Sequence, residues 1–230
     1  MTELAGARIL VTGATGALGS RIAQHLAAHG AQLVLTGRDA DKLQALGIPA
    51  ELFTLDLSLP GAAASLIHTV TASGQLDGIV AAHGVVAFGP VAELDTQTLS
   101  ALQALNQTSP IELITSVIPA LLASKAAGRE PFVLTISGVI ADLPTAGMAA
   151  YGASKAGLKS FVSATQRELR REGIRVVDTR PPHTETGLAS RAIAGVAPSM
   201  PQGLDPDAVA SRIVAAIVND EKDVPAELFS

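Results

Sequence analysis

Short apolar runs alternate with longer helical patterns along almost the whole chain. Each run is apolar throughout and rich in β-branched residues, which is typical of parallel strands buried on both faces. Strands are expected at 8–12, 32–36, 50–55, 76–82, 131–137 and 174–179, and helices near 17–29, 39–46, 60–73, 95–125, 151–172 and 205–219. Strands that alternate with helices favour right-handed crossovers. The pattern therefore predicts an α/β fold, a doubly wound parallel (Rossmann-like) sheet with helices on both faces.

The alternation runs through the 230 residues without a linker, a repeat or a low-complexity segment. A chain of this length can bury one large core, so we expect a single dinucleotide-binding and catalytic domain over residues 1–230. The least regular stretch is 183–204, which follows the last expected strand and is rich in glycine and proline. Its position predicts a lid over a substrate site.

Composition argues against several classes of protein. A net charge of −5 without a basic run is unlike a nucleic-acid-binding surface. The chain has no cysteine, which excludes disulfides and thiolate chemistry, and its five histidines show no metal-ligand spacing. No apolar run approaches the roughly 18 residues of a membrane span, and no signal peptide precedes the first strand. We therefore expect a cytoplasmic protein without a metal, nucleic-acid or membrane partner.

The first expected strand leads into T-G-A-T-G-A-L-G, residues 12–19, and then into a helix. The three glycines let the backbone turn tightly and approach a pyrophosphate, which the positive end of the following helix favours. A glycine turn that only packs a strand against a helix is the alternative. Because the turn follows the first strand of an alternating chain, it predicts dinucleotide binding. The candidate cofactor contacts in this turn are Gly13, Thr15, Gly16, Leu18 and Gly19.

Two strand ends bear on which dinucleotide binds. The second strand ends at Thr36, where NAD-binding folds usually carry a carboxylate for the ribose 2′-hydroxyl, and Arg38 is placed to meet a 2′-phosphate. This pair favours NADP over NAD, although an ordinary solvated arginine would look the same. The third strand ends in Asp56 and Leu57, which are further candidate cofactor contacts. Asp56 could accept a hydrogen bond from the adenine amino group, or it could cap the next turn.

Tyr151 is the only tyrosine of the chain, and Lys155 follows one helical turn later. Residues four apart on a helix share a face. A nearby ammonium lowers the pKa of a phenol, so the tyrosine can donate a proton to a carbonyl oxygen or take one from an alcohol. A packing tyrosine is the alternative. The pair opens the helix after the fifth expected strand, at the sheet edge where ligands bind, and this location favours catalysis.

Several motifs in order resemble the short-chain dehydrogenase/reductase family, in its compact single-domain branch, over roughly residues 7–187. They are the glycine turn, L-D-G-I-V-A-A-H-G, A-L-N-Q-T-S-P, L-T-I-S-G-V, Y-G-A-S-K and R-P-P-H-T-E-T. The resemblance implies an NADP(H)-dependent oxidoreductase that transfers a hydride between nicotinamide and a small carbonyl or alcohol substrate. It also implies a homodimer or homotetramer formed through the helices at 95–125 and 151–172.

The resemblance assigns roles to individual residues. Tyr151 would be the general acid/base, Lys155 would lower its pKa and bind ribose, and Asn106 would hold a proton-relay water. Further cofactor contacts would come from Arg38, Ala82, Gly84, Thr184 and Thr186.

The chain departs from the family pattern in its glycine turn and at two strand ends. The middle glycine of the turn is Gly16, a spacing similar to that of the extended branch, which includes epimerases and dehydratases. Ala82-His83-Gly84 replaces the usual N-A-G, and His83 either takes over the polar role of the asparagine or only packs. Pro182 stands where the family has glycine, which fixes φ and removes a backbone donor.

The largest departure concerns the catalytic serine of the family. Gly138 occupies its position, and Ser137 comes one residue early. Alternating side chains direct Ser137 away from Tyr151 unless the backbone kinks at Gly138. Ser137 is therefore a catalytic candidate whose expected orientation is away from the site. Two alternatives to the oxidoreductase stay open: an extended-branch epimerase or dehydratase, and a nucleotide-binding regulator with little turnover.

Overall fold

The computed structural model describes residues 2–229, and within them the chain forms one seven-stranded sheet. The strands are β1 (Arg8–Thr12), β2 (Gln32–Gly37), β3 (Ala50–Thr54), β4 (Gly78–Ala81), β5 (Phe132–Ile136), β6 (Arg175–Thr179) and β7 (Asp223–Val224). They run parallel in the order β3-β2-β1-β4-β5-β6-β7. The order reverses between β1 and β4, and ligands of open α/β sheets bind beyond the carboxyl ends of the strands at such a reversal. The doubly wound sheet expected from the sequence is confirmed.

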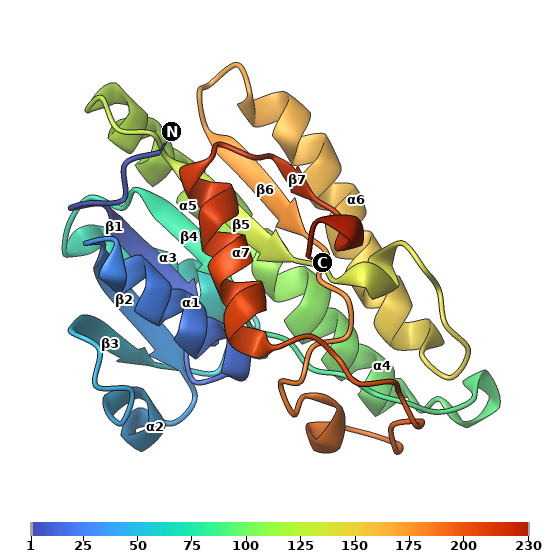
Figure 1. Ribbon diagram of the computed structural model, residues 1–230. Coiled ribbons are helices and arrows are strands. Elements are labelled where there is room, and N and C mark those ends of the chain that lie inside the picture. The colour runs from blue at the N-terminus through green and yellow to red at the C-terminus, as the bar shows by residue number, and fades with distance from the viewer. Residues whose placement is uncertain (1, 230) are drawn as a thin grey trace.

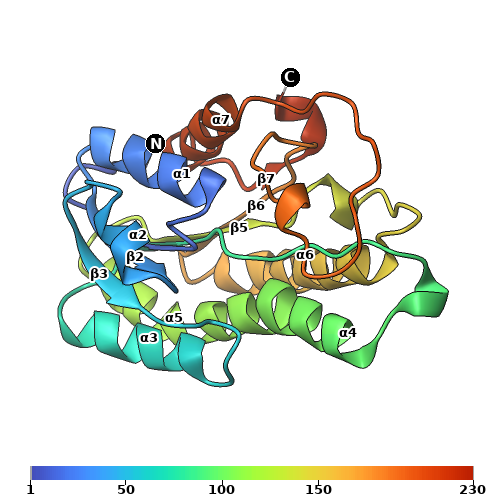
Figure 2. The same ribbon diagram turned by 90° about the horizontal axis from the view of Figure 1, so that it is seen from below.

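Helices cover both faces of this sheet, as Figures 1 and 2 show. Two of them, α1 (Ala17–Ala28) and α7 (Pro206–Val218), pack side by side on one face. The other face carries α3 (Ala62–Ala72), α5 (Ser109–Ala126) and α6 (Ala149–Leu169). The shorter helices are α2 (Ala40–Gln44), α4 (Thr96–Gln103), η1 (Val91–Glu93), η3 (Val139–Ala141), η4 (Ala189–Arg191) and η5 (Ala226–Phe229).

Strand alternation divides the core into two layers. Successive side chains of a strand point to opposite faces, so Ile9 and Val11 of β1 pack with α1 and α7. Leu10, between them, packs with α3 and α5 on the other face. The same alternation places Thr135 and Asp178 on the face that α6 covers, because Val133 and Val176 pack there two residues earlier. The strand phase therefore decides which polar side chains reach the underside of α6.

The structure divides the helix expected at 95–125 into three parts. A π-helical turn, η2 (Ala104–Thr108), joins α4 to α5 and contains Asn106. The turn contains neither glycine nor proline, so the sequence pattern reads as one uninterrupted helix. Strand β7 was not expected either, since two residues are too few to form a hydrophobic pattern.

The stretch 183–204 contains little regular structure, as the sequence indicates. Its backbone lies against the segment after β4, because Ile193 N–H donates to the Val86 carbonyl and Phe88 N–H donates to the Ala194 carbonyl, both at 2.9 Å. A Cβ atom at Gly195 would lie 1.9 Å from the Phe88 carbonyl oxygen, so only glycine allows this approach. The stretch is thus held beside the carboxyl edge of the sheet.

Two further properties concern residues 2–229 as a whole. No helix in this range is long and apolar enough to span a membrane. Nor does the range contain a group of three or more His, Cys, Asp or Glu side chains arranged to hold a metal ion.

Candidate active site

The glycine turn joins β1 to α1 at the point where the strand order reverses. Gly13 has a φ of +67°, and a Cβ atom there would lie 2.8 Å from the backbone of His83. At Gly19 a Cβ atom would lie 2.2 Å from the Gly13 carbonyl oxygen. Gly16 is the N-cap of α1 and supplies no side-chain hydrogen bond, so the first amides of α1 are available to an anion. These residues fit the pyrophosphate of a dinucleotide.

The end of β2 differs from the expectation at Thr36. This side chain is fully buried and its hydroxyl has no hydrogen-bond partner, so a carboxylate at this position would face the core rather than a ribose. A Cβ atom on the next residue, Gly37, would lie 3.1 and 3.2 Å from the methyl and hydroxyl groups of Thr15 in the glycine turn. Gly37, and not Thr36, is therefore the β2 residue that faces the turn.

Arg38 and Asp56 lie close together beyond β2 and β3. The Arg38 side chain is exposed and forms no hydrogen bond or ion pair with any residue in 2–229. Asp56 accepts a hydrogen bond from the backbone N–H of Ser58 at 2.9 Å. This bond lowers the pKa of Asp56, and the charge of Arg38 acts in the same direction. Asp56 thus caps the turn that contains the buried Leu57, while Arg38 is free to meet an anion.

His83 connects polar groups near the ends of β1 and β4, where the strand order reverses. Its Nδ1 atom lies 2.7 Å from the Thr12 hydroxyl, and its Nε2 atom lies 3.1 Å from the Ser109 hydroxyl. Burial, with a smaller contribution from the charge of Lys155, lowers the pKa of His83 to about 3. The imidazole is therefore neutral and ties the ends of β1 and β4 to the start of α5. Of the two interpretations of His83, the geometry supports the replacement of a polar anchor.

Gly84 lies where several candidate residues meet. A Cβ atom on Gly84 would come within 2.8 Å of the Asn106 side-chain oxygen and 3.6 Å of Lys155 Nζ. Asn106 is buried in the π turn, where its amide oxygen accepts from Val85 N–H at 2.9 Å. Its amide nitrogen donates to the Val85 carbonyl at 2.9 Å and to the Ser154 hydroxyl at 3.1 Å. The Asn106 side chain thus holds the backbone after Ala82 and Gly84 against α6.

Tyr151 and Lys155 occupy the first turns of α6, as the sequence predicts. Lys155 is 8% exposed, and its ammonium donates to the Ile136 carbonyl oxygen at 2.8 Å. Burial lowers the pKa of Lys155 to about 8. Tyr151 is partly buried, and its hydroxyl forms no hydrogen bond with the rest of residues 2–229.

Burial raises the pKa of Tyr151 to about 12. This direction is opposite to the expected one. The physical reason is that Lys155 donates to Ile136 instead of to the phenol, so burial of the ring is the effect that remains. Tyr151 is therefore a protonated phenol at neutral pH.

Ser137 and Gly138 end β5 in different environments. The Ser137 hydroxyl is fully buried and donates to Asp178 of β6 at 2.6 Å. Gly138 has a φ of +75°, and the nearest atom to a Cβ there would be the Pro181 carbonyl oxygen at 4.0 Å. The structure therefore joins Ser137 to Asp178 and leaves Gly138 without a side chain where the resemblance implies a serine.

Thr184 and Thr186 lie in the turns that follow β6. The Thr184 hydroxyl donates to the Pro182 carbonyl at 2.9 Å. Its backbone forms an isolated parallel bridge with Leu204 at the other end of the stretch 183–204. The Thr186 hydroxyl accepts a hydrogen bond from Leu188 N–H at 3.2 Å. Both hydroxyls thus shape local turns.

These observations describe one sheet edge that carries a glycine turn, an unpaired arginine and a tyrosine–lysine pair. The sequence profile of the short chain dehydrogenase family matches residues 7–196. The chain belongs to the short-chain dehydrogenase family. Its relatives in this family are named as oxidoreductases. The chain is 27% identical to dehydrogenase/reductase SDR family member 7B of Bos taurus, over 94% of this chain and 72% of that protein. It is 29% identical to the 3-oxoacyl-(acyl-carrier-protein) reductase of Escherichia coli (strain K12), over 92% and 89%.

Solved structures of short-chain dehydrogenases are similar over nearly the whole chain. A short-chain dehydrogenase from Sphingobium yanoikuyae in complex with NADPH has a TM-score of 0.86 and 25% identity, covering 95% of this chain and 87% of that one. A metagenomic short-chain oxidoreductase in complex with NADP has a TM-score of 0.80 and 30% identity, with 98% of each chain covered.

Sequence reasoning missed one feature of this short-chain dehydrogenase, a buried ion pair beneath α6. Asp178 and Arg180 are 2% and 5% exposed, and Arg180 Nη1 donates to Asp178 at 3.0 Å. The signal was present in R-V-V-D-T-R, where an acidic and a basic residue two apart point to the same face of a buried strand. Charged residues are almost never fully buried unless they are paired.

Proposed function

We propose that the chain is an NADP(H)-dependent oxidoreductase that reduces a small carbonyl substrate by hydride transfer, with Tyr151 as the proton donor. The observation that carries this proposal is the position of Tyr151 and Lys155, on the first turns of α6. Lys155 Nζ is close to Gly84 and bonded to the Ile136 carbonyl, beyond the ends of β4 and β5. This is the sheet edge where such folds bind ligands.

The choice of NADP(H) rests on Arg38. The guanidinium is exposed, has no hydrogen bond within residues 2–229, and lies beyond the β2 end that faces the glycine turn. Arginine binds phosphate through charge-assisted and often bidentate hydrogen bonds. The structural neighbours with NADPH and NADP bound support the same cofactor.

The chemistry divides between the cofactor and the chain. A bound nicotinamide supplies the hydride, and the protein supplies position and a proton. Tyr151 would donate its hydroxyl proton to the substrate carbonyl oxygen. Because burial raises the pKa of Tyr151 to about 12, the phenol carries at neutral pH the proton that it would donate. Lys155 would bind the cofactor ribose and stabilise the phenolate that forms.

Asn106 and the stretch 183–204 would complete the site. Asn106 would hold a proton-relay water from its place in the π turn, a type of irregularity that is frequent at functional sites. Thr184 and Thr186 would stand beside the nicotinamide. The stretch 183–204 would cover the substrate, which its backbone bonds to 86–88 support.

A second candidate is a nucleotide-binding regulator with little turnover. It is favoured by Gly138, which cannot steady a substrate carbonyl, and by the engagement of Ser137 with Asp178. NADPH oxidation with a panel of ketones separates the two candidates. The oxidoreductase predicts consumption of NADPH with at least one ketone. The regulator predicts that NADPH raises the apparent melting temperature, as a ligand that binds only the folded state does, while no ketone is reduced.

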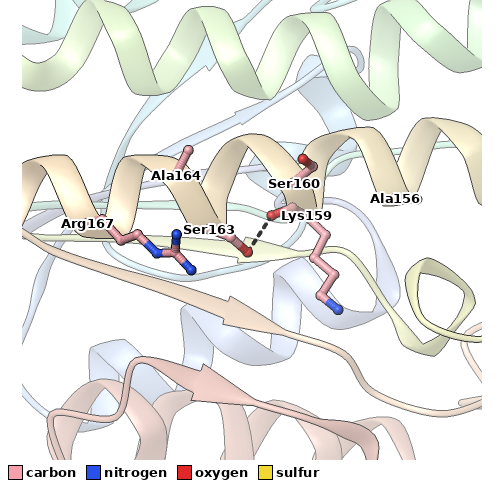
Figure 3. A pocket seen from close by; sticks show the side chains of 6 residues that line it. All are labelled: Ala156, Lys159, Ser160, Ser163, Ala164 and Arg167. Atoms are coloured by element: carbon pink, nitrogen blue, oxygen red, sulfur yellow. Dashed lines mark hydrogen bonds between the residues drawn. The ribbon is translucent and has the colours of Figure 1, made fainter.

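We further propose a homodimer or homotetramer formed through the outer sides of α5 and α6. On the outer side of α6, small and polar side chains line a shallow hollow of about 450 Å³ (Figure 3). Small side chains allow a second helix to approach closely. The hollow is lined by Ala156, Lys159, Ser160, Ser163, Ala164 and Arg167. Light scattering at micromolar concentration tests this assembly, and a monomer would contradict it.

A further inference from the structure

A buried carboxylate lies beneath α6, and within residues 2–229 it accepts hydrogen bonds from β5, from the residue after β5 and from the residue after β6. Asp178 Oδ1 accepts from the Thr135 hydroxyl at 2.8 Å. Asp178 Oδ2 accepts from the Ser137 hydroxyl at 2.6 Å and from Arg180 Nη1 at 3.0 Å. Burial raises the pKa of Asp178, and the three hydrogen bonds act against this effect because they favour the ionised carboxylate. Asp178 is therefore held in a fixed position as an acceptor.

The positive charge of Arg180 has carboxylate partners other than Asp178. It also donates two hydrogen bonds to Asp223, at 2.6 and 2.9 Å. Its Nε atom lies 2.6 Å from Asp142, which also pairs with Lys159 of α6. The Asp223 and Asp142 side chains are 57% and 31% exposed, whereas that of Asp178 is 3% exposed. Neutralising Asp178 would therefore leave Arg180 with two carboxylate partners.

The buried positive charge of Lys155, by contrast, has few hydrogen-bond acceptors around it. An ammonium has three donors, and the Ile136 carbonyl is the one acceptor that Lys155 has within residues 2–229. Ile136 lies between Thr135 and Ser137, whose hydroxyls both bind Asp178. The ammonium and the carboxylate therefore bind neighbouring residues at the end of β5, because Lys155 binds Ile136 and Asp178 binds the residues on either side of it. A buried ammonium without an opposite charge nearby loses its proton readily.

The other charged and titratable groups around Lys155 do not supply a negative charge that is free to stabilise its ammonium. On α6, Tyr151 is neutral at physiological pH, and Lys159 is a cation. Beyond β4, burial lowers the pKa of His83 to about 3, so this group is neutral as well. Arg180 is a cation, and its remaining partners Asp142 and Asp223 are bonded to it. Burial lowers the pKa of Lys155, and the negative charge of Asp178 acts to raise it.

We propose that Asp178 is a positioning residue that keeps the buried Lys155 ammonium charged, and that Ser137 serves Asp178 rather than the substrate. The proposal rests on the proposed function only for the consequence of that charge, which is ribose binding and stabilisation of the phenolate. It also accounts for Ser137: its hydroxyl, one residue before the expected place, is a donor to the carboxylate.

The test is the pKa of Lys155, measured by NMR with lysine labelled at Cε and assigned with Lys155→Met. Asp178→Asn keeps the shape of the side chain and removes its charge. We expect the pKa of Lys155 to fall by about one unit or more, as for loss of an opposite charge at close range. We also expect the Kd for NADPH at pH 8 to rise several-fold, because part of Lys155 becomes neutral.

Asp77→Asn is the matched control. Asp77 is also buried, and it accepts from the Ser124 hydroxyl at 2.7 Å, but it precedes β4 at the opposite edge of the sheet. This variant should lose thermal stability without any change in the pKa of Lys155. Equal pKa values for Lys155 in the wild type, Asp178→Asn and Asp77→Asn would overturn the proposal.

Two further measurements cover a variant that fails to fold. Asp178→Asn/Arg180→Met removes both buried charges together, and the pKa of Lys155 should fall by less than in Asp178→Asn because loss of the Arg180 cation acts in the opposite direction. In the wild type, the Cγ resonance of Asp178 should show an inflection at the pKa of Lys155, since interacting groups titrate together; no inflection would contradict the proposal. A fall in the pKa of Lys155 in a protein that reduces no ketone would sustain this pairing and refute the proposed function.

Discussion

The two edges of the sheet each bury a carboxylate, and the two carboxylates differ in what surrounds them. At the amino edge, burial acts to raise the pKa of Asp77, but hydrogen bonds from Ser124, Gln75 and the Arg8 backbone bring it below its ordinary value. At the carboxyl edge, burial of Asp178 dominates, and its pKa is raised in spite of the hydrogen bonds that it accepts.

The two carboxylates thus have similar partners but opposite pKa shifts. Asp77 accepts hydrogen bonds from Arg8 N–H at 2.9 Å and Gln75 at 2.7 Å, and it pairs with Arg129 at 3.7 Å, so its charge is compensated where it stands. It ties the starts of β1 and β4 to the end of α5. Asp178 pairs with Arg180 at 3.0 Å, and its charge also acts on the pKa of Lys155, a buried lysine with one acceptor within residues 2–229. We infer that the amino edge uses its carboxylate for stability and the carboxyl edge uses its carboxylate for a site.

The largest expected difference between the two edges is the effect of an arginine substitution on NADPH affinity. Arg38→Ala should weaken NADPH binding by about 10- to 100-fold, because a hydrogen bond to a charged group contributes roughly 1.5–3 kcal/mol. NADH, which lacks the 2′-phosphate, should bind as before. Arg129→Ala, at the amino edge, should change neither affinity. Titrating both cofactors against the three proteins checks this, and an equal loss of NADPH and NADH affinity in Arg38→Ala would exclude the phosphate role.

Substituting the serines that are hydrogen-bonded to the two carboxylates should affect stability similarly at both edges and turnover only slightly. Ser137→Ala and Ser124→Ala each remove a hydroxyl donor to a buried aspartate, at 2.6 and 2.7 Å. Both should lower the free energy of unfolding by about 1.5–3 kcal/mol in chemical denaturation. Turnover should change less than about tenfold in either variant, since one lost oxyanion donor costs roughly 10²-fold.

Gly138→Ser, assayed beside Ser137→Ala, tests whether Ser137 acts on the substrate. Space for the side chain exists, because the nearest atom to its Cβ lies 4.0 Å away, but the φ of +75° is strained for serine. We expect a modest loss of stability and a rise in turnover on simple ketones. An inactive Ser137→Ala together with an unimproved Gly138→Ser would show that Ser137 acts on the substrate.

The smallest expected effect, taken per pH unit, is the pH dependence of stability. Burial lowers the pKa of Lys155 to about 8, from an ordinary value of 10.5. Between these values the unfolded chain binds more protons than the folded one, so stability rises with pH. Relative to Lys155→Met, the free energy of unfolding should rise by up to about 1.4 kcal/mol per pH unit from pH 8 to 10. A flat difference in urea denaturation would contradict the lowered pKa.

Much of the fold follows from the sequence because alternation is a local signal. Each of the strands β1 to β6 contains a short apolar run, whereas β7 has two residues and no pattern. The π turn at Ala104–Thr108 depends on packing of Asn106 against Val85 and Ser154, which come from distant segments. A helical pattern in the sequence does not record such contacts.

The candidate site was predictable in its members more than in their contacts. Tyr151, Lys155 and the glycine turn come together at one edge because parallel strands end there. The orientation of Ser137 follows from strand alternation, but its acceptor, Asp178, lies 41 residues further along the chain. At β2 the expectation was wrong by one residue. The sequence does not reveal that Thr36 faces the core and that Gly37 faces Thr15.

The most direct test of the proposed chemistry at the carboxyl edge is Tyr151→Phe, which removes one hydroxyl and keeps the ring. NADPH oxidation with a reducible ketone should slow by about 10²-fold or more, the scale of one general acid, while the Kd for NADPH stays nearly unchanged. The measurement is steady-state turnover with cofactor titration on the same preparation. Loss of turnover with intact cofactor binding is the predicted result. Normal turnover in Tyr151→Phe would make Tyr151 a packing residue and contradict the assignment of the proton donor.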